Sequence, residues 1–233
     1  MRIGRFVLTA AFLLIALPAS AHLPRTATGS EVVVTDPEHS QVFYGELAGD
    51  AVTYRIVAEK GFNLFVNILT PLRSNPDGRF SVQVVQRIGE RRAPIADLDG
   101  TEGEWPLFHE PFADDDYRKG PELGKRVTPG TYEIVVWNDA MQGKYALALG
   151  EIERFNALDV VRLLVVLPLL KVQFFGWSIL EVMGSRIGVA WAIILLIVLG
   201  GGGAIVRRAR RIARQEHAAH QSESSPLDPP IIL

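Results

Sequence analysis

The sequence predicts a mainly-β protein: an antiparallel β-sandwich of jelly-roll type, followed by an interfacial helix and one C-terminal transmembrane helix. Short runs of β-branched and aromatic residues recur between residues 31 and 150, and turn signals separate them. Residues 187–206 carry no charged side chain. At about 1.5 Å rise per residue, a helix of that length crosses a bilayer core of about 30 Å. The first pattern predicts the globular fold, and the second predicts its anchor.

The expected strands alternate apolar and polar side chains, which is the period-two pattern of a sheet with one buried face. In residues 62–69, for example, Phe62, Leu64 and Val66 share one face. Residues 22–29 lack this pattern and are expected to form a loose leader. The strands are predicted at residues 31–35, 41–47, 52–58, 62–69, 81–86, 131–137 and 143–150.

Residues 129–151, PGTYEIVVWNDAMQGKYALALGE, carry the sharpest alternation. Two sets of apolar side chains flank a turn, which predicts a terminal β-hairpin. The side chains expected to face inward are those of Tyr132, Ile134, Val136, Tyr145, Leu147 and Leu149.

The same segment resembles the last hairpin of bacterial pre-peptidase C-terminal jelly-roll domains. Those domains are extracytoplasmic β-sandwiches attached to many different proteins. The whole chain also resembles uncharacterised membrane-anchored exported proteins with the same order of signal, sandwich and tail. The resemblance implies a fold and no activity.

Residues 97–122 combine acids with aromatic side chains and show little periodicity, so they predict a long loop. On a rigid sandwich, such a loop could bind a partner, because aromatic side chains supply contact area and carboxylates favour a basic surface. The alternative is an ordered crossing whose aromatic side chains pin it to the core. The candidate partner contacts are Trp105, Phe108, Phe112 and Tyr117.

Residues 1–21 have the parts of a secretory signal peptide. Arg2 and Arg5 form a basic start, residues 6–17 are apolar, and Ala19-Ser20-Ala21 has the small-x-small form of a cleavage site. Cleavage there would leave an exported domain at residues 22–154. An uncleaved signal anchor is the alternative.

A cluster of five arginines at residues 207–214 directly follows the predicted span. Basic residues beside a span face the cytoplasm, so the expected topology is single-pass, with the N-terminal domain outside and the C-terminus inside. Residues 207–233 are predicted to be a basic, disordered cytoplasmic tail.

Residues 155–183 are apolar, but Arg162, Pro168 and Lys171 interrupt them. The uncharged part is too short to span a bilayer, so we expect an amphipathic interfacial or packing helix near the outer membrane face, kinked at Pro168. A second span is the alternative, and it would place the domain and the arginine-rich tail on the same side.

Composition excludes several classes of function. The chain has no cysteine, which excludes thiol catalysis, thiolate metal sites and iron–sulfur clusters. Residues 22–154 carry 21 Asp and Glu against 14 Lys and Arg, a net charge of −7, and such an acidic domain argues against nucleic acid as a partner. No phosphate loop, nucleophile elbow, zinc-protease helix or dinucleotide fingerprint is present.

The sequence also offers two candidate metal sites. A mature N-terminal His22 would offer an amine and an imidazole to copper, and His39 or His109 could complete the site. An acidic calcium site is the other, although its spacing matches no known calcium loop. Its candidate ligands include Glu104, Glu110, Asp114, Asp115 and Asp116.

The expected function is that of a membrane-anchored, extracytoplasmic binding or scaffolding module without catalytic activity or cofactor. Its expected partners are the lipid bilayer and a membrane protein. The alternative is an envelope protein that binds copper or calcium, and an enzyme using the acidic segment is a third class.

Overall fold

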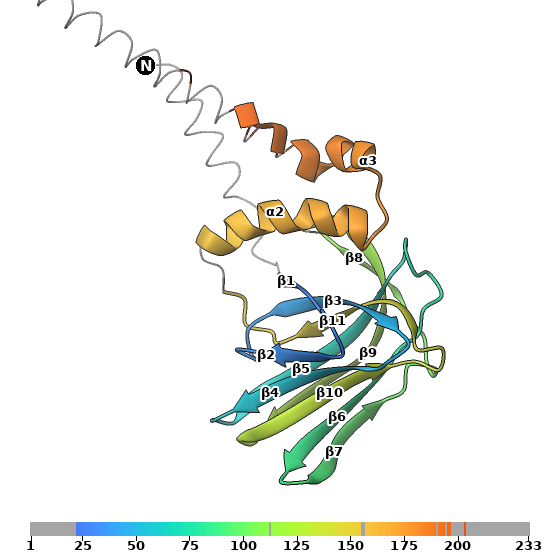
Figure 1. The fold of residues 1–233 in the computed structure, drawn as a ribbon, viewed down its shortest axis with the longest axis vertical. Coiled ribbons are helices and arrows are strands. Elements are labelled where there is room, and N and C mark those ends of the chain that lie inside the picture. Colours follow the sequence, from blue (N-terminus) through green and yellow to red (C-terminus); the bar gives the residue numbers. More distant parts are fainter. Residues whose placement is uncertain are drawn as a thin grey trace, which may run out of the picture.

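The computed structural model describes residues 22–111, 113–154, 157–189, 191–193, 195–196 and 203 (Figure 1). The predicted signal, the tail and most of the predicted span lie outside these residues. Within the described part, no helix is both long enough and apolar enough to cross a membrane.

Two β-sheets face each other, and helices cover the outer face of one of them (Figure 1). The six-stranded sheet, called sheet A, has the order β1 (Leu23–Thr26), β3 (Gln41–Ala48), β11 (Gln142–Leu149), β5 (Phe62–Pro71), β9 (Asp115–Val127) and β8 (Leu107–Glu110). The five-stranded sheet, called sheet B, has the order β2 (Glu31–Val34), β4 (Val52–Ala58), β10 (Gly130–Trp137), β6 (Ser81–Ile88) and β7 (Arg91–Leu98).

The core lies between the two sheets and is built by the predicted alternation. All six side chains predicted to face inward from β10 and β11 are buried there, which confirms the predicted inward faces of these strands. Tyr54 of β4 and Tyr145 of β11 meet across the core, with their hydroxyl groups 3.0 Å apart. Each buried hydroxyl therefore has a hydrogen-bond partner.

The predicted terminal hairpin is wrong, although both of its strands exist. β10 pairs with β4 and β6 in sheet B, whereas β11 pairs with β3 and β5 in sheet A. Between them the Asn138 side chain bonds both the backbone N–H and the carbonyl of Gln142, and the chain crosses from one sheet to the other. Alternation identifies the buried face of a strand but not its neighbour, so a short turn fits a corner as well as a hairpin.

Two strands at sheet edges were not expected. Residues 23–26 of the predicted loose leader form β1, which pairs in parallel with β3. β7 pairs with β6, yet most of its side chains are exposed or only half-buried. Such strands show little hydrophobic pattern, and an edge also tolerates Pro24.

The predicted long loop at residues 97–122 is also wrong for most of its length. It contains β8 and the first part of β9, which pairs with both β5 and β8. A register shift between Asn67 and Leu69 and the Gly120-Pro121 pair interrupt the alternation along this strand. A strand is predicted from period-two alternation, and this segment lacks that pattern because of the interruption and its polar outward side chains. The strand was therefore not predicted.

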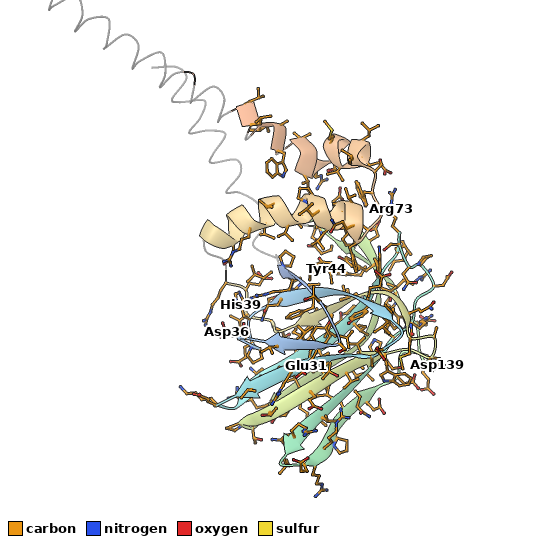
Figure 2. All side chains as sticks on the ribbon, in the orientation of Figure 1. Glu31, Asp36, His39, Tyr44, Arg73 and Asp139 are labelled. Carbon is orange, nitrogen blue, oxygen red and sulfur yellow. The ribbon has the colours of Figure 1, made fainter. Side chains whose placement is uncertain are left out.

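α2 (Ala157–Gln173) packs on the outer face of sheet A and continues through Pro168 (Figure 1). α3 (Ile179–Gly184) contacts α2 and lies farther from the sheet, and it begins with a capping box between Ser178 and Glu181. Arg73 reaches α3 from the sandwich, and its Nη2 lies 2.8 Å from Glu181 Oε1 (Figure 2). The predicted packing role of residues 155–183 thus corresponds to a second apolar cluster between helix and sheet, formed by Val42, Tyr44, Leu69, Tyr117, Ala146, Ala148, Leu170, Phe174 and Phe175.

Candidate binding pocket

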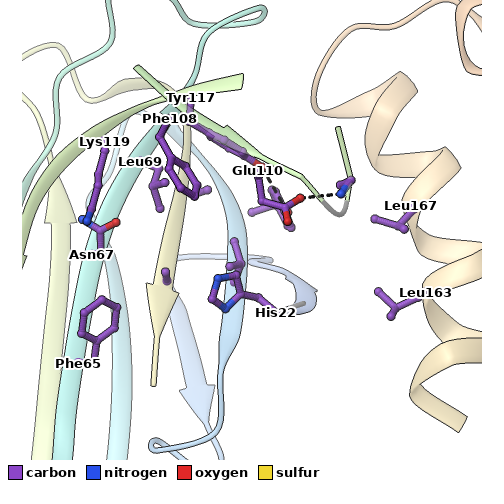
Figure 3. Close-up of a pocket in the computed structure, with 15 residues that line it drawn as sticks. His22, Phe65, Asn67, Leu69, Phe108, Glu110, Tyr117, Lys119, Leu163 and Leu167 are labelled. Carbon is purple, nitrogen blue, oxygen red and sulfur yellow. Dashed lines mark hydrogen bonds between the residues drawn. The ribbon is translucent and has the colours of Figure 1, made fainter. Parts of the chain in front are cut away.

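A pocket of about 180 Å³ lies between the outer face of sheet A and α2 (Figure 3). We call it the α2 pocket. Ala146 and Ala148 of β11 line it, and their small side chains leave space in the middle of the sheet. Larger side chains from the neighbouring strands enclose that space: Val42 and Tyr44 from β3, Phe65 and Leu69 from β5, and Tyr117 from β9.

The opposite wall comes from three separate parts of the chain. Leu163 and Leu167 belong to α2, Phe108 and Glu110 to β8, and His22 precedes β1. In Figure 3 the two leucines project from α2 toward the sheet, and His22 and Glu110 lie between them and β5. The pocket thus exists only because α2 is docked on the sandwich.

Few polar groups line the α2 pocket. His22 Nδ1 is hydrogen-bonded to Ser40 Oγ, and burial lowers the pKa of this imidazole, while the nearby Glu110 carboxylate opposes the shift. The ring is therefore neutral at pH 7. Glu110 Oε2 accepts a hydrogen bond of 2.6 Å from the backbone N–H of Ala113. Lys119 Nζ lies 2.8 Å from Glu122 Oε2.

A buried ion pair fixes α2 above the pocket. Lys171 Nζ lies 2.5 Å from Asp115 Oδ1 and donates a second bond, 3.1 Å long, to the carbonyl of Asp114. Both charged side chains are almost wholly buried. The ammonium also lies over the Trp177 ring, 4.2 Å from its centroid. The pair therefore sets the rotation of α2 about its axis.

Burial raises the pKa of Asp115 to about 6 from an ordinary value of 3.8, although its bond to Lys171 lowers it. Between these two values the folded protein holds a proton that the unfolded chain lacks. The stability contributed by this group therefore increases as the pH falls through about 6 and is complete near 3.8.

The Asp115→Asn variant provides a pH test of this shift. Wild type should gain stability relative to the variant between about pH 7.5 and about pH 5, because only wild type has the titrating carboxyl. Urea unfolding of both proteins at the two pH values measures the difference in their free energies of unfolding. The contributions of all other acidic residues are the same in both proteins and cancel in this difference. A difference that stays constant over this range would contradict the raised pKa of Asp115.

The predicted partner contacts have different positions. Trp105 is buried in the main core, where its Nε1 donates to the Gly100 carbonyl. Tyr117 is buried under α2, and its hydroxyl bonds that of Tyr44. Phe108 is 38% exposed and lines the α2 pocket, whereas Phe112 lies outside the described residues. Burial removes Trp105 and Tyr117 from any partner surface.

The predicted metal ligands do not converge on one point. His109 pairs with Asp116, at 2.9 Å, and lies 3.6 Å from Asp114. His39 Nε2 is bonded to the carbonyl of Arg154, in a different region of the sandwich. Asp115 forms an ion pair with Lys171, and Glu104 is exposed. His22 and Glu110 line the α2 pocket. In the part of the chain that the structure describes, no three His, Asp or Glu side chains form a metal-binding group.

The α2 pocket was not expected from the sequence. The available signal was the pair of alanines at outward positions of β11, between the large inward side chains of Tyr145, Leu147 and Leu149. Small residues on an outer face indicate either close packing or an enclosed space, and only the position of α2 distinguishes the two. Lys171 was taken for a break in an apolar run, although it is the anchor of the helix.

Comparison with known proteins identifies no family for the chain. No protein-family model matches the chain. No curated protein matches it. Among solved structures, the chain is similar to the pre-peptidase C-terminal domain of a collagenase from Bacillus anthracis, with 13% identity over 56% of this chain and 96% of that one, and a TM-score of 0.30.

This is the domain family that residues 129–151 resemble, but a match at that score does not establish membership. The two-sheet fold of this protein rests on its own strand pairing.

Proposed function

We propose that the protein is a non-catalytic binding module, held at the outer face of a membrane, that binds a small apolar group in the α2 pocket. The pocket itself is the observation that supports this proposal most. Ligand sites are typically concave, mostly apolar and equipped with a few fixed polar groups, and the α2 pocket has each of these properties.

The size of the pocket limits the ligand. A dry apolar cavity of roughly 150 Å³ holds a benzene-sized molecule. The α2 pocket, at about 180 Å³, is suited to one aromatic ring or a short aliphatic chain. A drug-sized molecule needs a cavity of about 300 Å³ or more. The ligand is thus a small molecule or the terminal group of a larger one.

The polar groups favour a ligand with a hydrogen-bond donor at one end. Glu110 supplies carboxylate oxygens, and His22 is a neutral ring. A hydroxyl or amine would donate to the Glu110 carboxylate, whereas a carboxylate at this end of the pocket would meet repulsion from Glu110. The Lys119 ammonium in the lining is already paired with Glu122. Both groups also hold structural bonds, to Ala113 and Ser40 respectively, which fix their positions in the pocket wall.

The location outside the membrane rests on the sequence. α3 ends at Gly184, the uncharged stretch 187–206 begins shortly after it, and the basic flank at residues 207–214 follows that stretch. A single span there would keep the sandwich beside other membrane proteins. A partner could then present the apolar group that the α2 pocket binds.

The test uses 4-methylphenol, an aromatic ring with one hydroxyl, and the full-length protein in lipid nanodiscs. Ligand that binds only the folded state raises its stability, so the unfolding temperature should increase with ligand concentration. Ala148→Leu, which fills the pocket, should remove most of this increase. Ala140→Leu adds the same group at an exposed turn and should keep it. Equal responses of the two variants would show that the α2 pocket is not the site.

A further inference from the structure

α2 is apolar on both of its faces. Leu163 and Leu170 are buried against sheet A, whereas Val165 and Leu169 on the other side are each 53% exposed. At about 100° per residue, Val165 lies roughly opposite the buried positions, and Leu169 lies about 100–120° from them, at the flank of the exposed side. A helix with apolar side chains on two sides is normally covered on both of them. Here the sandwich covers only one side of α2.

α3, which contacts α2, carries further exposed apolar side chains. In α3, Leu180 is 80% exposed, and Ile179 and Met183 are also exposed. The exposed apolar residues of the sandwich, such as Val57 and Ile88, are scattered over separate strands. A concentrated apolar patch marks an interaction surface, whereas scattered residues need no explanation. We call this patch the outer helical face: Val165, Leu169, Val172, Ile179, Leu180 and Met183.

The buried ion pair keeps this face outward. Lys171 lies on the sandwich side of α2 and holds Asp115, so the helix cannot rotate its exposed side chains toward sheet A without separating two buried charges. Breaking such a pair is costly. The outer helical face is therefore a fixed feature of the fold.

The chain itself indicates what covers this face. The uncharged stretch begins at Ile187, three residues after α3 ends at Gly184. If that stretch enters a bilayer, α3 must lie at the bilayer surface, and α2 is connected to α3 by only a few residues. Arg162 and Arg186, both exposed, flank the apolar patch and could reach lipid phosphates.

We propose that the outer helical face lies on the lipid bilayer, with its side chains about 5–10 Å into the boundary between headgroups and acyl chains. This inference rests on the membrane tether of the proposed function. It orients the sandwich, with sheet A toward the membrane and sheet B away from it. The α2 pocket then lies within about one helix diameter, 10–12 Å, of the lipid, so its ligand enters from the membrane boundary.

The absence of cysteine allows a direct test, because each introduced cysteine is unique. Full-length Val165→Cys, Leu169→Cys and Leu180→Cys are spin-labelled in vesicles of phosphatidylethanolamine with a minority of phosphatidylglycerol. Val57→Cys and Ile88→Cys, exposed positions on sheet B, are the matched controls. Oxygen concentrates in lipid and a neutral nickel chelate in water, so power saturation with each relaxant reports the surroundings of the label.

Labels on the outer helical face should be more accessible to oxygen than to nickel, and the two control labels should show the reverse. Labels at 165, 169 and 180 that behave like the controls would overturn the inference. Labels shielded from both relaxants would also overturn it, because protein would then cover this face. Flotation of every variant with the vesicles reports the tether separately, and 4-methylphenol binding reports the pocket.

Discussion

Lys171→Ala is expected to lower the free energy of unfolding by about 3–5 kcal/mol, because it leaves the Asp115 carboxylate buried without its cation. The loss should be smaller below about pH 6, where Asp115 is protonated and needs no counter-charge. Urea denaturation of the full-length protein in nanodiscs, followed by tryptophan fluorescence, measures the change. Trp177 lies against the Lys171 ammonium, so it should report the separation of α2 from the sheet.

Two variants make this test specific. Arg162→Ala removes an exposed cation from the same helix and should change stability by about 0.5 kcal/mol or less. Lys171→Met combined with Asp115→Leu replaces the pair by apolar side chains and should recover most of the stability. A loss for Lys171→Ala no larger than that for Arg162→Ala would show that the ion pair does not hold α2.

Ile134→Ala is expected to cost about 2–5 kcal/mol, the usual range for truncating a buried branched side chain. Ile134 is fully buried at the centre of sheet B, where it pairs with Tyr54 of β4 and Val84 of β6. The alanine would leave a cavity that neighbours on both sides cannot close. The same urea measurement gives the loss.

Glu133→Ala on the next residue is the control. Glu133 faces away from the core and pairs with Arg87 and Arg92, at 3.6 and 3.1 Å. Surface pairs of this kind contribute roughly 0–1 kcal/mol. Similar losses at positions 133 and 134 would contradict the register of β10.

The main core could be predicted from the sequence because its signal is local. Phe62, Leu64, Val66 and Ile68 occupy every second position, with Asn63 and Asn67 on the opposite face, and all four are buried between the sheets. The alternation of side chains along a strand depends on backbone geometry alone. The buried face can therefore be predicted without knowing which strands lie beside it. The same reasoning gave the correct inward faces of β10 and β11, but it could not tell that they belong to different sheets.

The α2 pocket could not be predicted, because it depends on contacts between distant segments. His22, Glu110, Ala148 and Leu163 come together only after the sandwich forms and α2 docks on it. The acidic segment shows the same limit. Asp114, Asp115 and Asp116 are neighbours in sequence, but Asp115 alone is buried against Lys171. The Asp115 carboxylate pairs with Lys171 of α2, whereas Asp114 and Asp116 remain at the surface.

The most direct test of the central claim is mass spectrometry of the protein isolated from its own membranes by mild detergent, with metal analysis of the same sample. We expect wild type to carry a small, mainly apolar molecule that is lost from Ala148→Leu and kept by Ala140→Leu. A stoichiometric copper or calcium ion with no organic ligand, retained equally in both variants, would contradict the assignment of the α2 pocket as the binding site.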